Sequence, residues 1–338
     1  MINSITLQGF KSFLYRDMNL NQLTLLTGLN SSGKSSIIQA LLMLEKAFNK
    51  EKNIFLEGHG NIKDLKNRYY DEDVKIGLEI DGLAFTANIG EQISTESLIS
   101  EFPDIWYISA NRFGPRTSIP VYDDNDINSI KIGPHGENVL KCIRHYEVEA
   151  PIVLDEKMRH PEASSFGLME NIRKWLQVIS PNIDFDYQVF DKNDTSYSTF
   201  DGYRAKNVGF GLSYILPVIT TLLVATSSQK NVVLIENPEA HLHPRGQTEL
   251  AKLIFLCAKC GVQVIIETHG EHILDGIRIA TKEDGEFAKN IQIQWFELDE
   301  ERNTEVSSPV IDNKGKISEW PKGFFDQFEI NTSTLLSK

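Results

Sequence analysis

The feature that most constrains this chain is a glycine-rich segment, GLNSSGKSS, at residues 28–36. It follows an apolar stretch, LTLLT, and precedes SSIIQALLMLEKAF, in which apolar residues recur at helical spacing. The segment fits the pattern G-x-x-x-x-G-K-[ST] of phosphate-binding loops. Gly28 and Gly33 let backbone N–H groups turn toward phosphate oxygens, and the following helix points its positive end at them. We therefore expect a nucleotide-binding α/β domain rather than a glycine-rich turn with a surface lysine.

Three side chains have predicted roles in binding a nucleotide and its metal. Lys34 would place its charge on the β- and γ-phosphates, and Ser35 would offer its hydroxyl to Mg²⁺. The apolar stretch NVVLI ends in Glu236. A carboxylate at the end of such a strand can hold Mg²⁺ through water, whereas the alternative is an ordinary charged residue that ends a strand.

The residue after Glu236 does not identify the general base of ATP hydrolysis. In many ATP-hydrolysing proteins a second acid follows the metal-binding one and activates water, but here the next residue is Asn237. An amide can orient water and has no useful basicity, so we expect slow hydrolysis or a base at Glu239, the nearest spare carboxylate. His269, at the end of the apolar stretch VIIETH, is the next candidate; the alternative for it is a packed or solvated loop histidine.

A second glycine-containing segment, KNVGFGLSYILPVI at residues 206–219, precedes another predicted helix. Gly209, Gly211 and Ser213 lie at its start, which predicts a second anion-binding helix N-terminus. The alternative is a flexible loop with a helix cap. In AHLHP, His241 and His243 have no third metal ligand at a suitable spacing, so we expect them to serve turn packing or interface contacts.

Charge and composition exclude several classes. The net charge of −13 argues against a protein that coats DNA, although one local basic patch remains compatible with it. The three cysteines favour a reducing compartment, and the CAKC spacing of Cys257 and Cys260 favours two thiols on a buried helix face over zinc. The start of the chain lacks a signal-peptide pattern, and the longest apolar run, YILPVITTLLVAT, is too short to span a bilayer. We therefore expect a cytoplasmic protein without a membrane partner.

The order of predicted strands and helices along the chain indicates an α/β fold with a mainly parallel sheet, N-terminal antiparallel strands and a partly helical insert. VKIGLEI and LAFTANI read as an antiparallel pair, while NVVLIE, VQVIIET and IQIQWFEL read as buried strands between helices. We expect residues 1–118 to form the N-terminal part of an ATPase head and 119–200 an insert or lid. Residues 201–307 would complete the head, and 308–338 would form a tail.

Several of these motifs together resemble the ABC-type, P-loop NTPase heads of the SMC, RecF and OLD (overcoming lysogenisation defect) group. The resemblance covers residues 1–118 and 201–307. GFKSF looks like the first-strand motif, GLNSSGKSS the phosphate loop, GFGLS the signature motif, IENPEAHLHP the magnesium-binding strand and ETHGEH the switch histidine. It implies ATP and Mg²⁺ as cofactors, with Ser35 and Glu236 as metal ligands and Glu236, Asn237, Glu239 and His269 in catalysis. The nucleotide contacts that it implies are Lys11, Gly28, Asn30, Ser31, Ser32, Gly33, Lys34, Ser35, Ser36, Gly209, Gly211 and Ser213.

The resemblance also implies how such a head works. Two copies would enclose two ATP molecules as a homodimer, each phosphate loop facing the partner's GFGLS segment, and slow hydrolysis would reset the switch. The C-terminal GKISEWPKGFFDQF looks like an uncharacterised branch whose members often stand beside nucleases or other effectors in antiphage systems. We expect no Toprim nuclease domain after the last strand, and we expect the acidic run at residues 123–126 to be a solvated loop. A RecF-like DNA-repair ATPase and a non-hydrolysing, ATP-dependent scaffold remain the alternatives, so DNA stays open as a partner.

Overall fold

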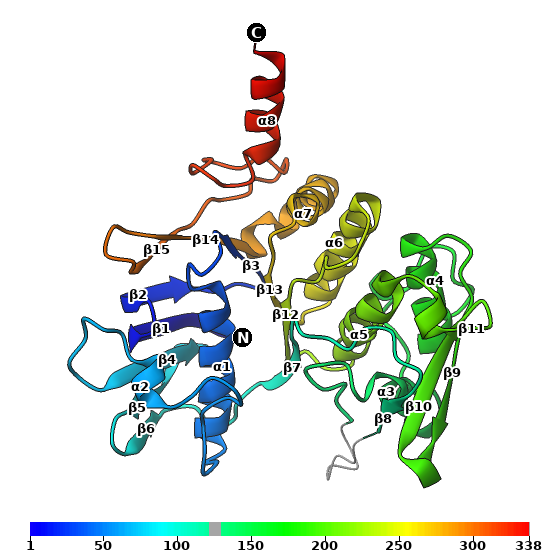
Figure 1. Ribbon diagram of the computed structural model, residues 1–338, viewed down its shortest axis with the longest axis horizontal. Coiled ribbons are helices and arrows are strands. Elements are labelled where there is room, and N and C mark those ends of the chain that lie inside the picture. The colour runs from blue at the N-terminus through cyan, green and yellow to red at the C-terminus, as the bar shows by residue number, and fades with distance from the viewer. Residues whose placement is uncertain (122–129, 338) are drawn as a thin grey trace. The chain divides into compact units, whose positions relative to one another are not determined.

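The computed structural model describes residues 1–121 and 130–337 and divides the chain into two compact units. Unit 1 consists of Met1–Pro103 and Thr281–Lys338, and unit 2 consists of Asp104–Ala280 (Figure 1). The acidic run at 123–126 lies outside the described residues. Within the described part of the chain, no helix is both long and apolar enough to cross a membrane.

Unit 1 contains an antiparallel sheet with the strand order β2-β1-β4-β5-β6. In β1 the buried side chains of Ile5 and Leu7 alternate with partly exposed neighbours, as predicted for a half-buried strand. β4 and β5 form the predicted hairpin, in which Asp81 and Gly82 turn the chain with φ of 50° and 83°. The strands are β1 (Ile2–Phe10), β2 (Phe13–Asn19), β4 (Val74–Ile80), β5 (Leu83–Ile89) and β6 (Ile93–Ser97).

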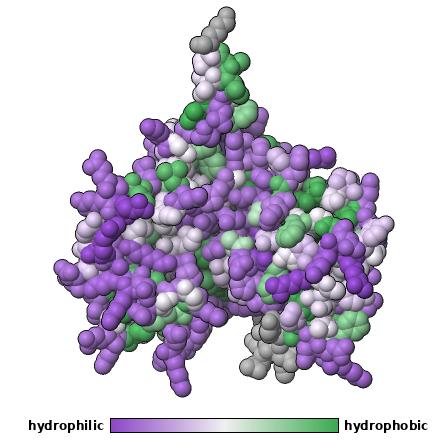
Figure 2. Space-filling model, viewed as in Figure 1, coloured by the Kyte–Doolittle hydropathy of each residue, from purple (hydrophilic) through white to green (hydrophobic). Residues whose placement is uncertain are grey.

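A second group of strands in unit 1 includes β3, which leads into the phosphate loop. β3 (Leu23–Gly28) and β14 (Ile291–Leu298) pair in parallel, and β15 (Thr304–Ser307) pairs with β14 in antiparallel fashion. β3 is buried along its whole length, which explains its continuous apolar sequence. The helices are α1 (Lys34–Phe48), α2 (Ile62–Leu65), the 3₁₀ helix η5 (Gly285–Asn290) and α8 (Gln327–Leu336). α8 has no buried residue, and its apolar side chains face solvent (Figure 2).

Unit 2 contains three parallel strands, β7 (Asp104–Ile108), β12 (Asn231–Glu236) and β13 (Gln263–Glu267). Every residue of β13 and every residue of β12 before Glu236 is buried, which confirms the prediction of continuous apolar strands in a parallel sheet. Pro244 opens α6 and Gly261, with φ 98°, follows its end, as expected for helix termini. The helices of this part are α5 (Phe210–Ala225), α6 (Pro244–Lys259) and α7 (Glu271–Glu283).

The remainder of unit 2 includes residues 119–200, for which a partly helical insert or lid is predicted. Helices are present there as α3 (Val139–Arg144), the π-helical η1 (His145–Glu149) and α4 (Leu168–Ile179). A small antiparallel sheet was not predicted: β10 (Thr195–Phe200) pairs with β8 (Ile119–Pro120), β9 (Phe185–Phe190) and β11 (Tyr203–Arg204). β9 alternates apolar with polar residues, which is the local pattern of a half-buried strand and was overlooked. β10 buries Ser196 and Ser198 together with Phe200, so no apolar alternation marks it in the sequence. Short 3₁₀ turns complete the insert: η2 (Glu156–Met158), η3 (Asp191–Asn193) and η4 (Ala205–Asn207).

Candidate functional site

The phosphate loop of unit 1 joins β3 to α1 with three residues at positive φ. Gly28 has φ 146°, Ser31 62° and Gly33 107°. A Cβ at Gly28 would lie 2.2 Å from the carbonyl oxygen of Phe296, so only glycine fits against β14 there. α1 begins at Lys34, directly after Gly33, which has no side chain to cap the helix. The first turn of α1 is therefore left for an anion.

Lys34 lies under this loop with only 3% of its surface exposed. Its Nζ donates hydrogen bonds to the carbonyl oxygens of Gly28, at 3.1 Å, and Leu29, at 2.7 Å. The hydroxyl of Ser32 donates to the same Leu29 carbonyl at 2.7 Å. Hydrogen bonds thus hold the ammonium and the loop backbone together, with the charge close to the place where phosphate oxygens would bind.

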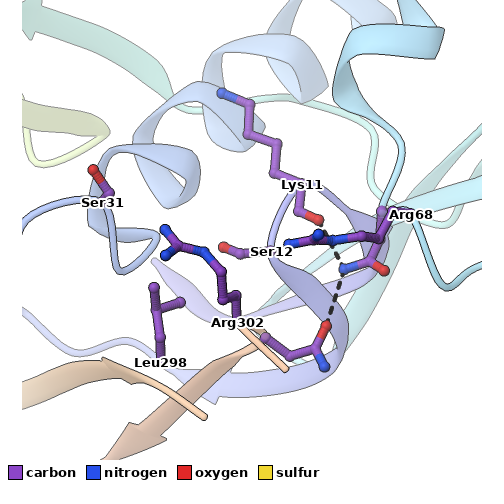
Figure 3. A pocket seen from close by; sticks show the side chains of 8 residues that line it. Lys11, Ser12, Ser31, Arg68, Leu298 and Arg302 are labelled. Carbon is purple, nitrogen blue, oxygen red and sulfur yellow. Dashed lines mark hydrogen bonds between the residues drawn. The ribbon is translucent and has the colours of Figure 1, made fainter. Parts of the chain in front are cut away.

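A polar pocket of about 220 Å³ lies beside Ser31 in unit 1. In Figure 3 the guanidinium of Arg302 points between Ser31 and Ser12, and that of Arg68 lies beside Ser12. Lys11 contributes its backbone to the pocket, while its Nζ reaches Gln39 of α1, and burial lowers the pKa of this lysine. Lys11, Ser12, Ser31, Asn67, Arg68, Leu298, Arg302 and Asn303 line the pocket. The two guanidinium groups beside a phosphate loop favour an anionic ligand.

Thr304, the first residue of β15, holds the phosphate loop and the turn after β1 in place. Its Oγ1 donates to the carbonyl oxygen of Ser32 at 2.8 Å and lies 2.6 Å from Oγ of Ser12. Its backbone N–H donates to the carbonyl oxygen of Ser12 at 2.7 Å. A Cβ at Gly33 would lie 2.7 Å from Oγ1 of Thr304, so the close approach needs glycine. Thr304 could not be identified from the sequence, because no local pattern marks a residue 272 positions from its partner.

In unit 2, the carboxylate of Glu236 is fixed at the end of β12. Its Oε1 accepts a hydrogen bond from the hydroxyl of Tyr107 at 3.1 Å, and its Oε2 accepts one from the backbone N–H of Ala110 at 3.0 Å. Burial, followed by the charge of Glu236, raises the pKa of Tyr107, so the phenol stays protonated and acts as a donor. Each carboxylate oxygen keeps a lone pair for a further partner. Tyr107 was also missed by sequence reasoning.

Asn237 follows Glu236 with φ 44°, in the left-handed region. Its N–H donates to the carbonyl oxygen of Glu267 at 2.8 Å, which ties the turn to the end of β13. Among the described residues, its side-chain Oδ1 is buried without a hydrogen-bond partner. Asparagine tolerates this backbone conformation better than most residues, and its amide is left to contact a ligand or water.

Glu239 and His269 lie together in unit 2. Oε1 of Glu239 accepts a hydrogen bond from the backbone N–H of His269 at 2.9 Å, and the hydroxyl of Thr268 also bonds to this carboxylate. Oε2 is buried and has no partner within the described part of the chain. Burial raises the pKa of Glu239. A raised pKa makes this carboxylate a stronger base than an exposed one.

The segment at residues 209–213, here named the signature segment, forms the start of α5. Gly209 is the N-cap with φ −62°, and a Cβ added to it would meet no atom within 4 Å. A Cβ at Gly211 would instead lie 2.8 Å from the carbonyl oxygen of His241. The ring of His241 packs against Phe210 and Tyr214, and His243 caps α6 by accepting from the N–H of Arg245. His241 therefore serves turn packing, and His243 is a helix cap.

Metal-ligating side chains do not cluster in the part of the chain that the structure describes. In residues 1–121 and 130–337 no three His, Cys, Asp or Glu side chains gather as a metal site. The hydroxyl of Ser35 and the carboxylate of Glu236 are oxygen donors of the kind that Mg²⁺ prefers. A Mg²⁺ ion bound by either group would take its other ligands from water and from nucleotide phosphates, which is the usual arrangement for this cation.

The sequence matches two family models. One, described as an AAA ATPase domain, covers residues 1–111 and 153–274. The other, described as a protein of unknown function (DUF3696), covers residues 288–335. No curated protein matches the chain.

Solved structures with the same fold include an Smc head domain with an extended coiled coil bound to the C-terminal domain of ScpA, derived from Pyrococcus furiosus. The TM-score is 0.57, at 14% identity and 99% coverage of both chains. An SmcHead bound to the C-winged helix domain of ScpA gives a TM-score of 0.56 at 13% identity, with 92% of this chain and 98% of that one covered. At such identities the likeness concerns the fold alone. It confirms the predicted α/β class of P-loop NTPase head, with N-terminal antiparallel strands and a mainly parallel sheet.

Proposed function

The chain belongs to the AAA ATPase domain family, and we propose that it binds ATP with Mg²⁺ and hydrolyses it slowly. The conformation of the phosphate loop carries this proposal: Gly28 and Gly33 adopt positive φ, and Lys34 lies buried against the loop carbonyls. An incoming phosphate oxygen would replace those carbonyls as the partner of the ammonium. The charge of Lys34 is therefore available to the β- and γ-phosphates without a large rearrangement.

The nucleotide contacts follow from the loop and from the pocket beside it. We assign the phosphates to the loop at residues 28–36 and to the open first turn of α1. The pocket next to Ser31 would receive a further anionic group of the nucleotide, because the guanidinium groups of Arg68 and Arg302 supply a positive field there. The phosphate contacts are Gly28, Asn30, Ser31, Ser32, Gly33, Lys34, Ser35 and Ser36.

Mg²⁺ would be held by Ser35 and Glu236 and, when bound, would polarise the γ-phosphate. Tyr107 and Ala110 keep the Glu236 carboxylate in one orientation while it contacts the ion or a water of its shell. Asn237 orients the attacking water through its side-chain amide, whose Oδ1 is unbonded among the described residues. Glu239 takes the proton, with His269 as the second candidate. A general base contributes about 10²–10⁴-fold to a rate, so a displaced base is consistent with slow turnover.

The test is phosphate release by the purified full chain with ATP and Mg²⁺. Glu236→Gln removes the negative charge and keeps the size of the side chain, and we expect it to reduce turnover by about 10²-fold or more. Glu249→Gln is the matched control, because Glu249 lies on α6 in a surface pair with Lys252 and has no assigned role. Equal turnover in wild type and Glu236→Gln would refute the assignment.

We also propose that two copies enclose ATP as a dimer, in which the signature segment of one copy meets the nucleotide of the other. Gly209 leaves open space at the N-terminus of α5, where an added Cβ would meet no atom within 4 Å. Such a helix start offers N–H groups to a phosphate. Sedimentation with and without a non-hydrolysable ATP analogue tests the proposal, and a monomer under both conditions contradicts it.

The output of the switch would pass to a separate protein. The two Smc heads of similar fold were solved with a ScpA domain bound, so heads of this shape carry protein partners. For this chain we propose a cytoplasmic effector, such as a nuclease, and a role in antiphage defence, as the resemblance to the SMC, RecF and OLD group implies. Phage plating on cells that carry the chain and its neighbouring gene tests this, with Lys34→Ala as the inactive comparison. Equal plaque counts for both contradict the defence role.

A further inference from the structure

Arg112 lies buried in unit 2, where its guanidinium contacts backbone carbonyls at the end of β12. Only 2% of its surface is exposed. Nη1 donates to the carbonyl oxygens of Ser109 and Glu236, both at 2.8 Å, and Nη2 donates to that of Asn237 at 2.7 Å. Burial lowers the pKa of Arg112 to about 10, so the group remains charged at neutral pH. The three hydrogen bonds are charge-assisted and therefore stronger than bonds between neutral groups.

The two carbonyls flank the backbone of Asn237. The carbonyl of Glu236 lies before the φ torsion of Asn237, and the carbonyl of Asn237 lies after the ψ torsion of the same residue. A planar guanidinium holds its nitrogens at a fixed separation, so bonds from Nη1 and Nη2 to these carbonyls restrict both torsions together. This restriction helps to hold Asn237 at φ 44°, a conformation that is uncommon for residues with a Cβ, although asparagine tolerates it better than most.

The same guanidinium also contacts α5. It lies over the ring of Tyr214, 5.3 Å from the centroid, one turn after the start of the helix. Tyr214 packs edge-on against His241 at 4.5 Å, and Phe210 packs against His241 at 5.6 Å. Arg112 thus has the first turn of α5 on one side and the backbone of Asn237 on the other. A shift of the signature segment changes the position of Tyr214 and, through the cation–π contact, that of Arg112.

We propose that Arg112 is a positioning residue that couples the signature segment to the turn at residues 236–239. It sets the backbone of Asn237, and thereby the directions of the Glu236 and Asn237 side chains, according to the position of α5. This inference rests on the proposed ATPase function, in which those side chains hold Mg²⁺ and orient water. The coupling itself is a property of the folded chain, so it is measurable without nucleotide.

The experiment compares wild type with Arg112→Lys, which keeps a positive charge but cannot place two nitrogens on two carbonyls. We expect kcat to fall by about tenfold or more while the Kd for ATP changes by less than about twofold. The amides of Asn237 and Ala240, bonded to the carbonyls of Glu267 and Asn237, should exchange hydrogen about tenfold faster. Arg116→Lys is the control, because this exposed arginine follows in the same loop and stacks on Phe113.

Tyr214 variants test the coupling when Arg112→Lys fails to fold. Tyr214→Leu removes the ring and leaves the hydrogen bonds of Arg112, and we expect it to speed exchange at Asn237 and to lower kcat. Tyr214→Phe keeps the ring and should retain both wild-type values. Unchanged exchange at Asn237 in Arg112→Lys or in Tyr214→Leu overturns the inference. If wild type itself releases no phosphate, the proposed function fails, and the exchange measurements still decide whether Arg112 positions the turn.

Discussion

The backbone N–H of His269 donates a 2.9 Å hydrogen bond to Oε1 of Glu239. The two residues follow neighbouring parallel strands, β12 and β13, and Gly270 packs against the same side chain, since a Cβ there would lie 3.0 Å from Cγ of Glu239. Glu239 is the spare carboxylate nearest in sequence to Asn237, the position at which many ATP-hydrolysing proteins have a second acid. It is therefore hydrogen-bonded to the loop that contains His269, the candidate switch histidine. A displacement of that loop changes the orientation of Glu239 directly.

Glu239→Gln should show the pH dependence of a buried acid. Burial raises the pKa of Glu239 above that of an unfolded carboxyl, so the folded chain binds this proton more tightly than the unfolded chain does. Its contribution to stability is then present at low pH and is lost as the pH rises through the raised pKa. We expect Glu239→Gln to raise Tm relative to wild type more at pH 8 than at pH 5. A constant Tm difference between the two proteins at all pH values would show that Glu239 does not titrate in this way.

The same variant has an expected effect on catalysis. If Glu239 is the base, Glu239→Gln should lower kcat by about 10²-fold at pH 8 and leave the KM for ATP nearly unchanged. Phosphate release over a pH series is the measurement. Unaltered turnover would move the role of base to His269.

Lys34→Ala should weaken ATP binding. A charge-assisted hydrogen bond contributes roughly 1.5–3 kcal/mol, which corresponds to an affinity loss of about ten- to a hundredfold. Lys46→Ala is a matched control on the same helix, since Lys46 pairs with Glu51 at the surface. Titration calorimetry with ATP and Mg²⁺ distinguishes them. Equal affinity in both variants would remove the phosphate-loop assignment.

Gly209→Asp should prevent ATP-induced dimer formation. The position has open space and an ordinary φ, and aspartate is a favourable helix N-cap, so the variant should fold at least as well as wild type. Its charge would face the γ-phosphate of the partner's nucleotide and repel it. Gly209→Asn is the control, because it keeps the shape without the charge. Gly211 is a poorer choice, because any Cβ there meets the His241 carbonyl.

Sedimentation with an ATP analogue compares these two variants. We expect the Gly209→Asn variant to dimerise and the Gly209→Asp variant to remain monomeric. If the Gly209→Asp variant forms dimers, the partner's nucleotide is contacted by a segment other than the signature segment.

Asn237→Glu should raise turnover and reduce stability. The new carboxylate supplies a base next to Glu236, for which we expect a gain of about tenfold or more in kcat. Glutamate tolerates φ 44° less well than asparagine, which costs about 1 kcal/mol. Phosphate release and thermal unfolding, measured on the same preparation, test both parts. Lower turnover with an intact fold would show that Asn237 has a role that a carboxylate cannot replace.

Much of the fold could be predicted because periodicity and turn residues are local signals. Continuous apolar runs predict β12 and β13, and the structure confirms both. Pro244 and Gly261 stand at the two ends of α6, where these residue types are favoured. The motif spacing in turn located the phosphate loop, Glu236 and the signature segment. The roles of those residues in ATP hydrolysis stay predictions.

The supporting residues could not be predicted, because their partners are distant in sequence. Tyr107 is 129 positions from Glu236, and Arg112 is 125 positions from Asn237. The segment DIWYISANRFGPR showed a strand that leads into a basic turn, but nothing in it indicates which carbonyls the arginine contacts. Such contacts depend on the packing of β7 beside β12, which only the folded chain specifies.

The hydrogen bond from Thr304 to Ser32 has a consequence for synthesis on the ribosome. The phosphate loop is translated more than 250 residues before β14, which flanks Gly28, and before Thr304, which holds Ser32. Until the β14–β15 hairpin has left the exit tunnel, the loop lacks the neighbours that fix its conformation. We therefore expect a nascent chain to become able to bind phosphate only after that stage.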